Sequence, residues 1–148
     1  MQSELLERCN VLEECYEFML GYAAKGLPAD GGSGPGSEIR EVLERGANAI
    51  KGLVESCTVA FNSAFKEADV AHPSKYQAFL TVLEGDARAS LAAIELVLAQ
   101  ASISSQLVDN LNASIHLRAL LTDLFLIGDI LRSRHSPRAN SLSAADQS

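Results

Sequence analysis

The 148-residue sequence contains no tryptophan, only four prolines and few aromatic residues, which make up 5% of the chain. Its β-branched residues never alternate with polar residues over a run that would suit a half-buried strand. Alanine and leucine dominate instead, and both residues favour helices. The missing strand pattern argues against a β-rich fold, so we expect an all-α protein.

The sequence also lacks an excess of positive charge. Its 12 lysine and arginine residues are outnumbered by 19 aspartate and glutamate residues, which gives a formal net charge of −7. A surface that binds nucleic acid needs clustered basic residues to release counterions from the phosphates. The one basic cluster is Arg132, Arg134, His135 and Arg138, which is typical of the last turn of a helix. We therefore expect no nucleic-acid partner.

Secretory and membrane signals are missing as well. The first segment, MQSELLERCNVLEEC, is acidic where a secretory signal needs positive charge and an unbroken apolar run. The most apolar stretch, residues 107–132, is interrupted by Arg118, Asp123 and Asp129, which a membrane span rarely tolerates. Three cysteines without metal-like spacing are typical of free thiols in a reducing compartment. We expect a cytoplasmic protein without a membrane span.

What the sequence does contain is helical periodicity. Apolar residues recur at intervals of three and four, the spacing of one helix face. This spacing predicts helices over about residues 3–26, 37–68, 74–101 and 104–133. The glycine- and proline-rich segment 28–36 is typical of a linker. We expect an antiparallel up-down-up-down four-helix bundle over residues 1–133, followed by a disordered polar tail over 134–148.

Two local features refine this bundle. Gly46 and Gly52 lie within the second predicted helix, where a missing side chain allows a neighbouring helix to approach closely. Ser104 or Ser105 can cap the fourth predicted helix through its hydroxyl group.

Motifs for common catalytic chemistry are absent. The chain has no Glu-x-x-His for a di-iron site, no Cys-x-x-Cys-His for attached haem, no zinc-ligand spacing and no glycine-flanked serine elbow. We therefore expect no metal, no cofactor and no enzymatic activity. Cys9 and Cys57 fall in one predicted core layer, where small buried hydrophobic residues are the favoured interpretation over a redox pair or soft-metal site.

One short string resembles a known motif. Residues 114–118, Ser-Ile-His-Leu-Arg, resemble the histidine boxes of phosphorelay proteins, which implies His116 as a weak phosphoacceptor candidate. The string departs from those boxes after Arg118, where Ala119 stands instead of the usual glycine or proline pattern. The alternative interpretation of His116 is a surface histidine on a polar strip.

The fourth predicted helix has two apolar arcs. The first would face the bundle, and its apolar members are Leu107, Val108, Leu111, Ile115, Phe125 and Leu126. Arg118 lies within this arc, so its buried charge needs a partner, and Asp86 is the predicted mate. The second arc has no remaining helix to cover it, which predicts a homodimer interface. Its members are Leu117, Leu120, Leu124, Ile127 and Leu131. The wide apolar arc of the first helix is the alternative surface.

These observations predict a non-catalytic helical interaction module, a scaffold or regulatory adaptor that self-associates as a homodimer or binds another protein. The alternative is a histidine phosphotransfer-like or small-ligand-binding bundle. The two hypotheses differ in what they require, an apolar outer face for the first and a polar cavity or exposed activated histidine for the second.

Overall fold

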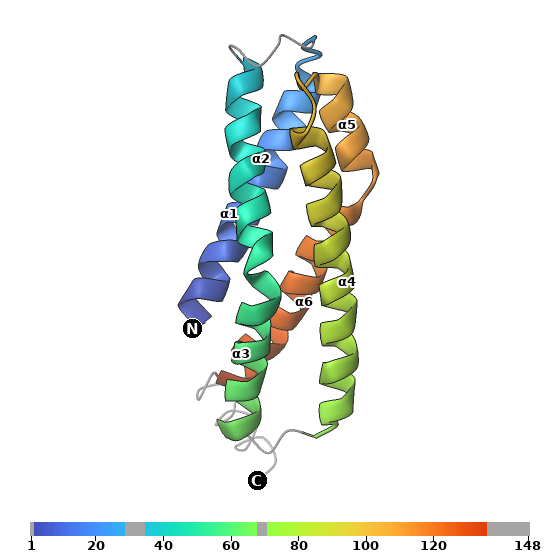
Figure 1. Ribbon diagram of the computed structural model, residues 1–148. Helices are drawn as coiled ribbons and strands as arrows, with labels where there is room; N and C mark the ends of the chain where they lie inside the picture. The colour runs from blue at the N-terminus through green and yellow to red at the C-terminus, as the bar shows by residue number, and fades with distance from the viewer. Residues whose placement is uncertain (1, 29–34, 68–70, 136–148) are drawn as a thin grey trace.

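The computed structural model describes residues 2–28, 35–67 and 71–135, and within these ranges every regular element is a helix. The prediction of an all-α fold is therefore confirmed (Figure 1). The helices are α1 (Gln2–Ala24), α2 (Pro35–Lys51), α3 (Leu53–Glu67), α4 (Pro73–Leu98), α5 (Ser105–Ala113) and α6 (His116–His135).

Two of the predicted helices are divided. The second becomes α2 and α3, which follow one another along one side of the molecule and separate at Gly52 (Figure 1). The fourth becomes α5 and α6, because Ile115 adopts a left-handed conformation with φ 61° that a helix cannot include. Ser104 caps α5 by accepting a hydrogen bond from the Leu107 N–H at 3.1 Å, which confirms one of the two predicted caps.

The ends of the helices differ from prediction by a few residues. Gly26 terminates the α1 turn with φ 64°, a conformation that glycine adopts without steric cost. Helix α2 starts at Pro35, inside the predicted linker, since proline suits the first turn of a helix. Helix α6 continues through His135, two residues into the predicted tail. Residues 29–34 of the linker and 136–148 of the tail lie outside the described residues.

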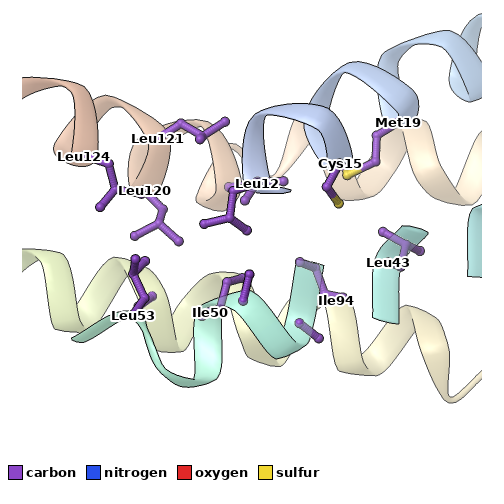
Figure 2. Packing of buried hydrophobic residues seen from close by; sticks show 14 of the residues in the cluster. Leu12, Cys15, Met19, Leu43, Ile50, Leu53, Ile94, Leu120, Leu121 and Leu124 are labelled. Carbon is purple, nitrogen blue, oxygen red and sulfur yellow. The ribbon is translucent and has the colours of Figure 1, made fainter. Parts of the chain in front are cut away.

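The core draws apolar side chains from all six helices. Figure 2 shows Leu12 of α1, Leu53 of α3 and Leu120 of α6 directed into the same space between the helices. Each of these three side chains is fully buried. Helix α4 packs against α2, α3 and α6, while α1 packs against α2, α3, α5 and α6. Burying these apolar faces against one another is the main source of stability in such a fold.

A group of hydrogen bonds, called the joint below, links the end of α1 to the connection between α4 and α5. The Tyr22 hydroxyl donates to the Ile103 carbonyl at 2.6 Å, and the Ser105 hydroxyl donates to the Tyr22 carbonyl at 2.5 Å. The Leu27 N–H donates to the Ser105 Oγ at 2.8 Å, and the Ser105 N–H donates back to the Leu27 carbonyl at 2.9 Å. These bonds satisfy backbone groups that burial would otherwise leave without water.

Arg8 of α1 reaches the junction of α2 and α3. Its guanidinium donates to the Ala49 carbonyl at 3.1 Å and forms an ion pair with Glu4 at 3.0 Å. A Cβ placed on Gly52 would collide with this guanidinium. A Cβ on Gly46 would lie 2.8 Å from the Cys15 Sγ, so both glycines sit at close helix approaches, as predicted.

We expect Gly52→Ala and Arg8→Ala to be energetically coupled. Alanine gains about 1 kcal/mol of helix propensity over glycine, but in the native chain its methyl group expels the Arg8 guanidinium from the carbonyls. Gly52→Ala should therefore be neutral or destabilising alone and stabilising by about 1 kcal/mol in an Arg8→Ala background. Urea unfolding of the single and double variants measures this, and additive changes would contradict the contact.

Candidate functional site

The predicted dimer interface lies inside the chain. Leu117, Leu120, Leu124 and Ile127 are all buried, and Leu120 has no exposed surface. The prediction that they form an uncovered face is wrong, because α1 and α4 of the same chain pack against α6, and Leu53 of α3 points toward Leu120 (Figure 2). The side chain of Leu131 lies outside the described residues.

The opposite arc is the one that reaches the surface. Phe125 is 50% exposed although it was assigned to the bundle-facing arc, whereas Val108 and Leu111 of the same predicted arc are buried. The two buried residues belong to α5 and the exposed residue belongs to α6. The break at Ile115 rotates α6 relative to α5, so one helical wheel cannot describe both helices.

The predicted buried ion pair between Asp86 and Arg118 does not form. Arg118 is exposed, and none of the ion pairs among the described residues joins it to Asp86. Because water solvates its charge, Arg118 needs no buried counter-charge. The Asp86 carboxyl instead contributes to raising the pKa of Asp123 on α6.

Asp86 and Asp123 form a carboxyl pair between α4 and α6. Asp123 Oδ2 is buried and has no hydrogen-bond partner within the described part of the chain. Burial is the largest cause that raises the pKa of Asp123 to about 7, and the hydrogen bond to Asp86 and the Asp86 charge raise it further.

His116 is the first residue of α6 and is exposed. It follows directly on the left-handed Ile115 and so stands at a helix end rather than midway along a helix face. Nothing in this placement adds to the five-residue resemblance on which the phosphoacceptor hypothesis depends.

The three cysteines are free thiols. Burial raises the pKa of Cys9 to about 11, of Cys15 to about 11 and of Cys57 to about 12. The Cys9 charge adds to the increase at Cys57, which places the two residues near one another, in keeping with the predicted shared layer. Since the thiolate is the reactive form, thiols with such raised pKa values are poor nucleophiles at neutral pH.

Two surface hollows follow one another along α1 and α6. One hollow of about 200 Å³ has an apolar lining from Leu6, Cys9 and Leu124, with Arg132 among its residues. A second hollow of about 290 Å³ follows along the same two helices. We define the α1–α6 groove by Leu6, Cys9, Glu13, Tyr16, Glu17, Arg118, Leu121, Phe125, Gly128 and Arg132.

Sequence reasoning missed most of this groove. The wide apolar arc of the first helix was the one signal for it, since that arc contains Cys9 and Tyr16, which line the groove. Phe125 could not be found in this way because the helical wheel placed it in the core.

Two structural searches gave negative results for the described ranges 2–28, 35–67 and 71–135. No helix there is long and apolar enough to cross a membrane. No group of three or more histidine, cysteine, aspartate or glutamate side chains in these ranges is arranged to hold a metal ion. The chain matches no protein-family model, and comparisons with curated proteins and with solved structures return no match.

Proposed function

We propose that the chain is a non-catalytic helical interaction module that self-associates through the α1–α6 groove. The proposal treats the chain as an antiparallel four-membered bundle in which α2 with α3, and α5 with α6, each act as one member. The observation that carries it is the exposed apolar surface along the groove. Leu6 is 58% exposed and Phe125 is 50% exposed, and each lines one of the two hollows. Apolar surface gathered in this way marks protein interfaces.

The charges along the groove favour a second copy of the chain as the partner. Arg132 lines the hollow at one end, while Glu13 and Glu17 line the hollow at the other end together with Arg118. A two-fold axis across the groove reverses its direction, so Arg132 of one copy faces Glu17 of the second copy. The same operation brings Arg118 toward Asp129, which pairs with Arg132 within one chain. The surface is therefore complementary to itself.

The three free cysteines support a reducing compartment such as the cytoplasm for this module. An amphipathic helix of another protein is the alternative occupant, because such helices bind apolar grooves of this kind. A second candidate function is binding of a small apolar ligand, which the 200 Å³ hollow beside Leu6 and Cys9 favours. Such a ligand would raise the melting temperature of a monomeric variant.

Phe125→Glu should convert the dimer to a monomer. The substitution places a charge at the centre of the proposed interface, where desolvating it would oppose association. Leu96→Glu is the matched control, because Leu96 is 67% exposed on α4 and lies outside the groove. Light scattering measures the mass of both variants, and circular dichroism confirms that each remains folded.

Charge reversal at Arg132 and Glu17 tests the proposed interface in a second way. Arg132→Glu should weaken the dimer through repulsion with Glu17 of the second copy, and adding Glu17→Arg should restore it. A dimer that survives Phe125→Glu, or a Leu96→Glu variant that dissociates equally, would argue against the groove as the interface.

A further inference from the structure

We propose that the hollow beside Gly128 receives the Phe125 side chain of a second copy of the chain. We call it the Gly128 hollow; it measures about 200 Å³ and is lined by Leu6 and Cys9 of α1 and by Leu124 and Gly128 of α6. The inference rests on the proposed function, since it requires self-association through the α1–α6 groove, and it names the contact at the centre of that interface.

Gly128 is a glycine that the fold of the single chain does not require. It lies in the interior of α6, where glycine costs helix stability relative to alanine. Its backbone does not demand glycine, because the positive φ among the described glycines belongs to Gly26. Packing does not demand it either, since a Cβ placed on Gly128 would meet no atom within 4 Å. Gly46 and Gly52 differ, because a Cβ at either position would collide with a side chain of α1.

The position of Gly128 in the groove gives its open space a use. Gly21 of α1 and Gly85 of α4 also have no atom near a Cβ, but they line neither hollow of the groove. Gly128 lines one of them together with apolar side chains. A cavity of about 150 Å³ is large enough to hold benzene. The Gly128 hollow, at about 200 Å³, therefore has room for one phenyl ring.

Phe125 presents such a ring on the same face of α6. It is 50% exposed and lies three residues before Gly128, so the two residues are neighbours on the helix surface. Phe125 lines the adjoining hollow and not the Gly128 hollow of its own chain. An exposed aromatic ring gains much from burial in an apolar site, and such rings dominate the energetics of interfaces.

A two-fold axis between Phe125 and Gly128 brings the ring of one copy over the glycine of the other. The axis reverses the direction of α6, so residues equally far from it on either side face one another. Phe125 of one copy then lies opposite Gly128 of the second copy, and the contact is made twice. The same axis brings Arg132 to Glu17 of the second copy, so shape and charge favour one arrangement.

Gly128→Leu should change folding and association in opposite directions. Leucine favours the helix and enters open space, so the melting temperature of the monomer at low concentration should rise. The same side chain fills the hollow and should raise the dissociation constant of the dimer at least about tenfold. Gly85→Leu is the matched control, because Gly85 is an equally open helix glycine outside the groove. Circular dichroism and sedimentation equilibrium of the full chain measure the two quantities.

An exchange of side-chain size tests the contact itself. Phe125→Ala removes the ring and Gly128→Phe fills the hollow, so each variant alone should dimerise at least about tenfold more weakly than the unmodified chain. In a mixed dimer the introduced ring lies against the small alanine, while the remaining Phe125 enters the remaining hollow. Mixing the two variants should therefore restore association. Leu126→Ala should leave it unchanged, because Leu126 is also 50% exposed but lines neither hollow.

The outcomes distinguish this contact from the proposed function. A dimer that Gly128→Leu weakens and Gly85→Leu does not, with recovery on mixing, supports the inference. A dimer that Phe125→Glu dissociates but Gly128→Leu leaves intact would overturn the contact and keep the groove as the interface. A chain that is monomeric at every concentration would reject the self-association and the contact together. If that monomer bound the apolar dye ANS and Gly128→Leu abolished the binding, the hollow would belong to a small apolar ligand instead.

Discussion

Replacing Leu120 with alanine should lower the free energy of unfolding by about 2–5 kcal/mol. Leu120 has no exposed surface, and its side chain points toward Leu12 and Leu53 in the core (Figure 2). Truncation removes apolar contacts and leaves a cavity that the surrounding helices fill only in part. Urea unfolding monitored by circular dichroism measures the change.

Leu126→Ala provides the control on the same helix. Leu126 is half exposed, so the same truncation there should change stability by less than about 0.5 kcal/mol. Leu120→Glu, which a surface interface would tolerate, should instead unfold the chain, because an unpaired charge cannot be buried in this core. A folded Leu120→Glu monomer would show that the buried face of α6 has been assigned to the wrong side.

Ser105→Ala should destabilise the chain by about 1–3 kcal/mol. The variant removes the acceptor of the Leu27 N–H and the hydroxyl that donates to the Tyr22 carbonyl, both at the joint between α1 and α5. Amide hydrogen exchange of Leu27 should accelerate along with the loss of global stability.

Ser104→Ala is the matched control for this joint. Ser104 caps α5 through the Leu107 N–H, so its loss should cost about 1 kcal/mol without exposing the Leu27 amide. Equal protection of Leu27 in both serine variants would contradict the role assigned to Ser105.

The fold class was predictable because it depends on local spacing. Residues such as Leu12, Leu43 and Ile94 recur at helical intervals, and each is buried as its spacing requires. The phase of α6 was not predictable, because the break depends on Ile115, a β-branched residue that rarely adopts a positive φ. A sequence pattern carries no signal for such a turn, and the error reversed the two faces of α6.

The break at Ile115 also explains why the predicted ion pair between Asp86 and Arg118 does not form. Arg118, which was expected in the core beside Asp86, lies at the surface, and Asp86 instead raises the pKa of Asp123. Two neighbouring carboxyl groups are not a pairing that sequence reasoning favours, because their like charges repel one another. The groove was missed for a related reason: it forms between α1 and α6, which lie at opposite ends of the chain.

Sedimentation equilibrium of the unmodified chain at about pH 6, over a wide range of concentration, tests the central claim most directly. Our account predicts a mass that approaches twice the 15.8 kDa of the single chain as concentration rises. It also predicts that Phe125→Glu stays at the monomer mass under the same conditions. A mass of 15.8 kDa for the unmodified chain at every concentration would contradict self-association through the α1–α6 groove.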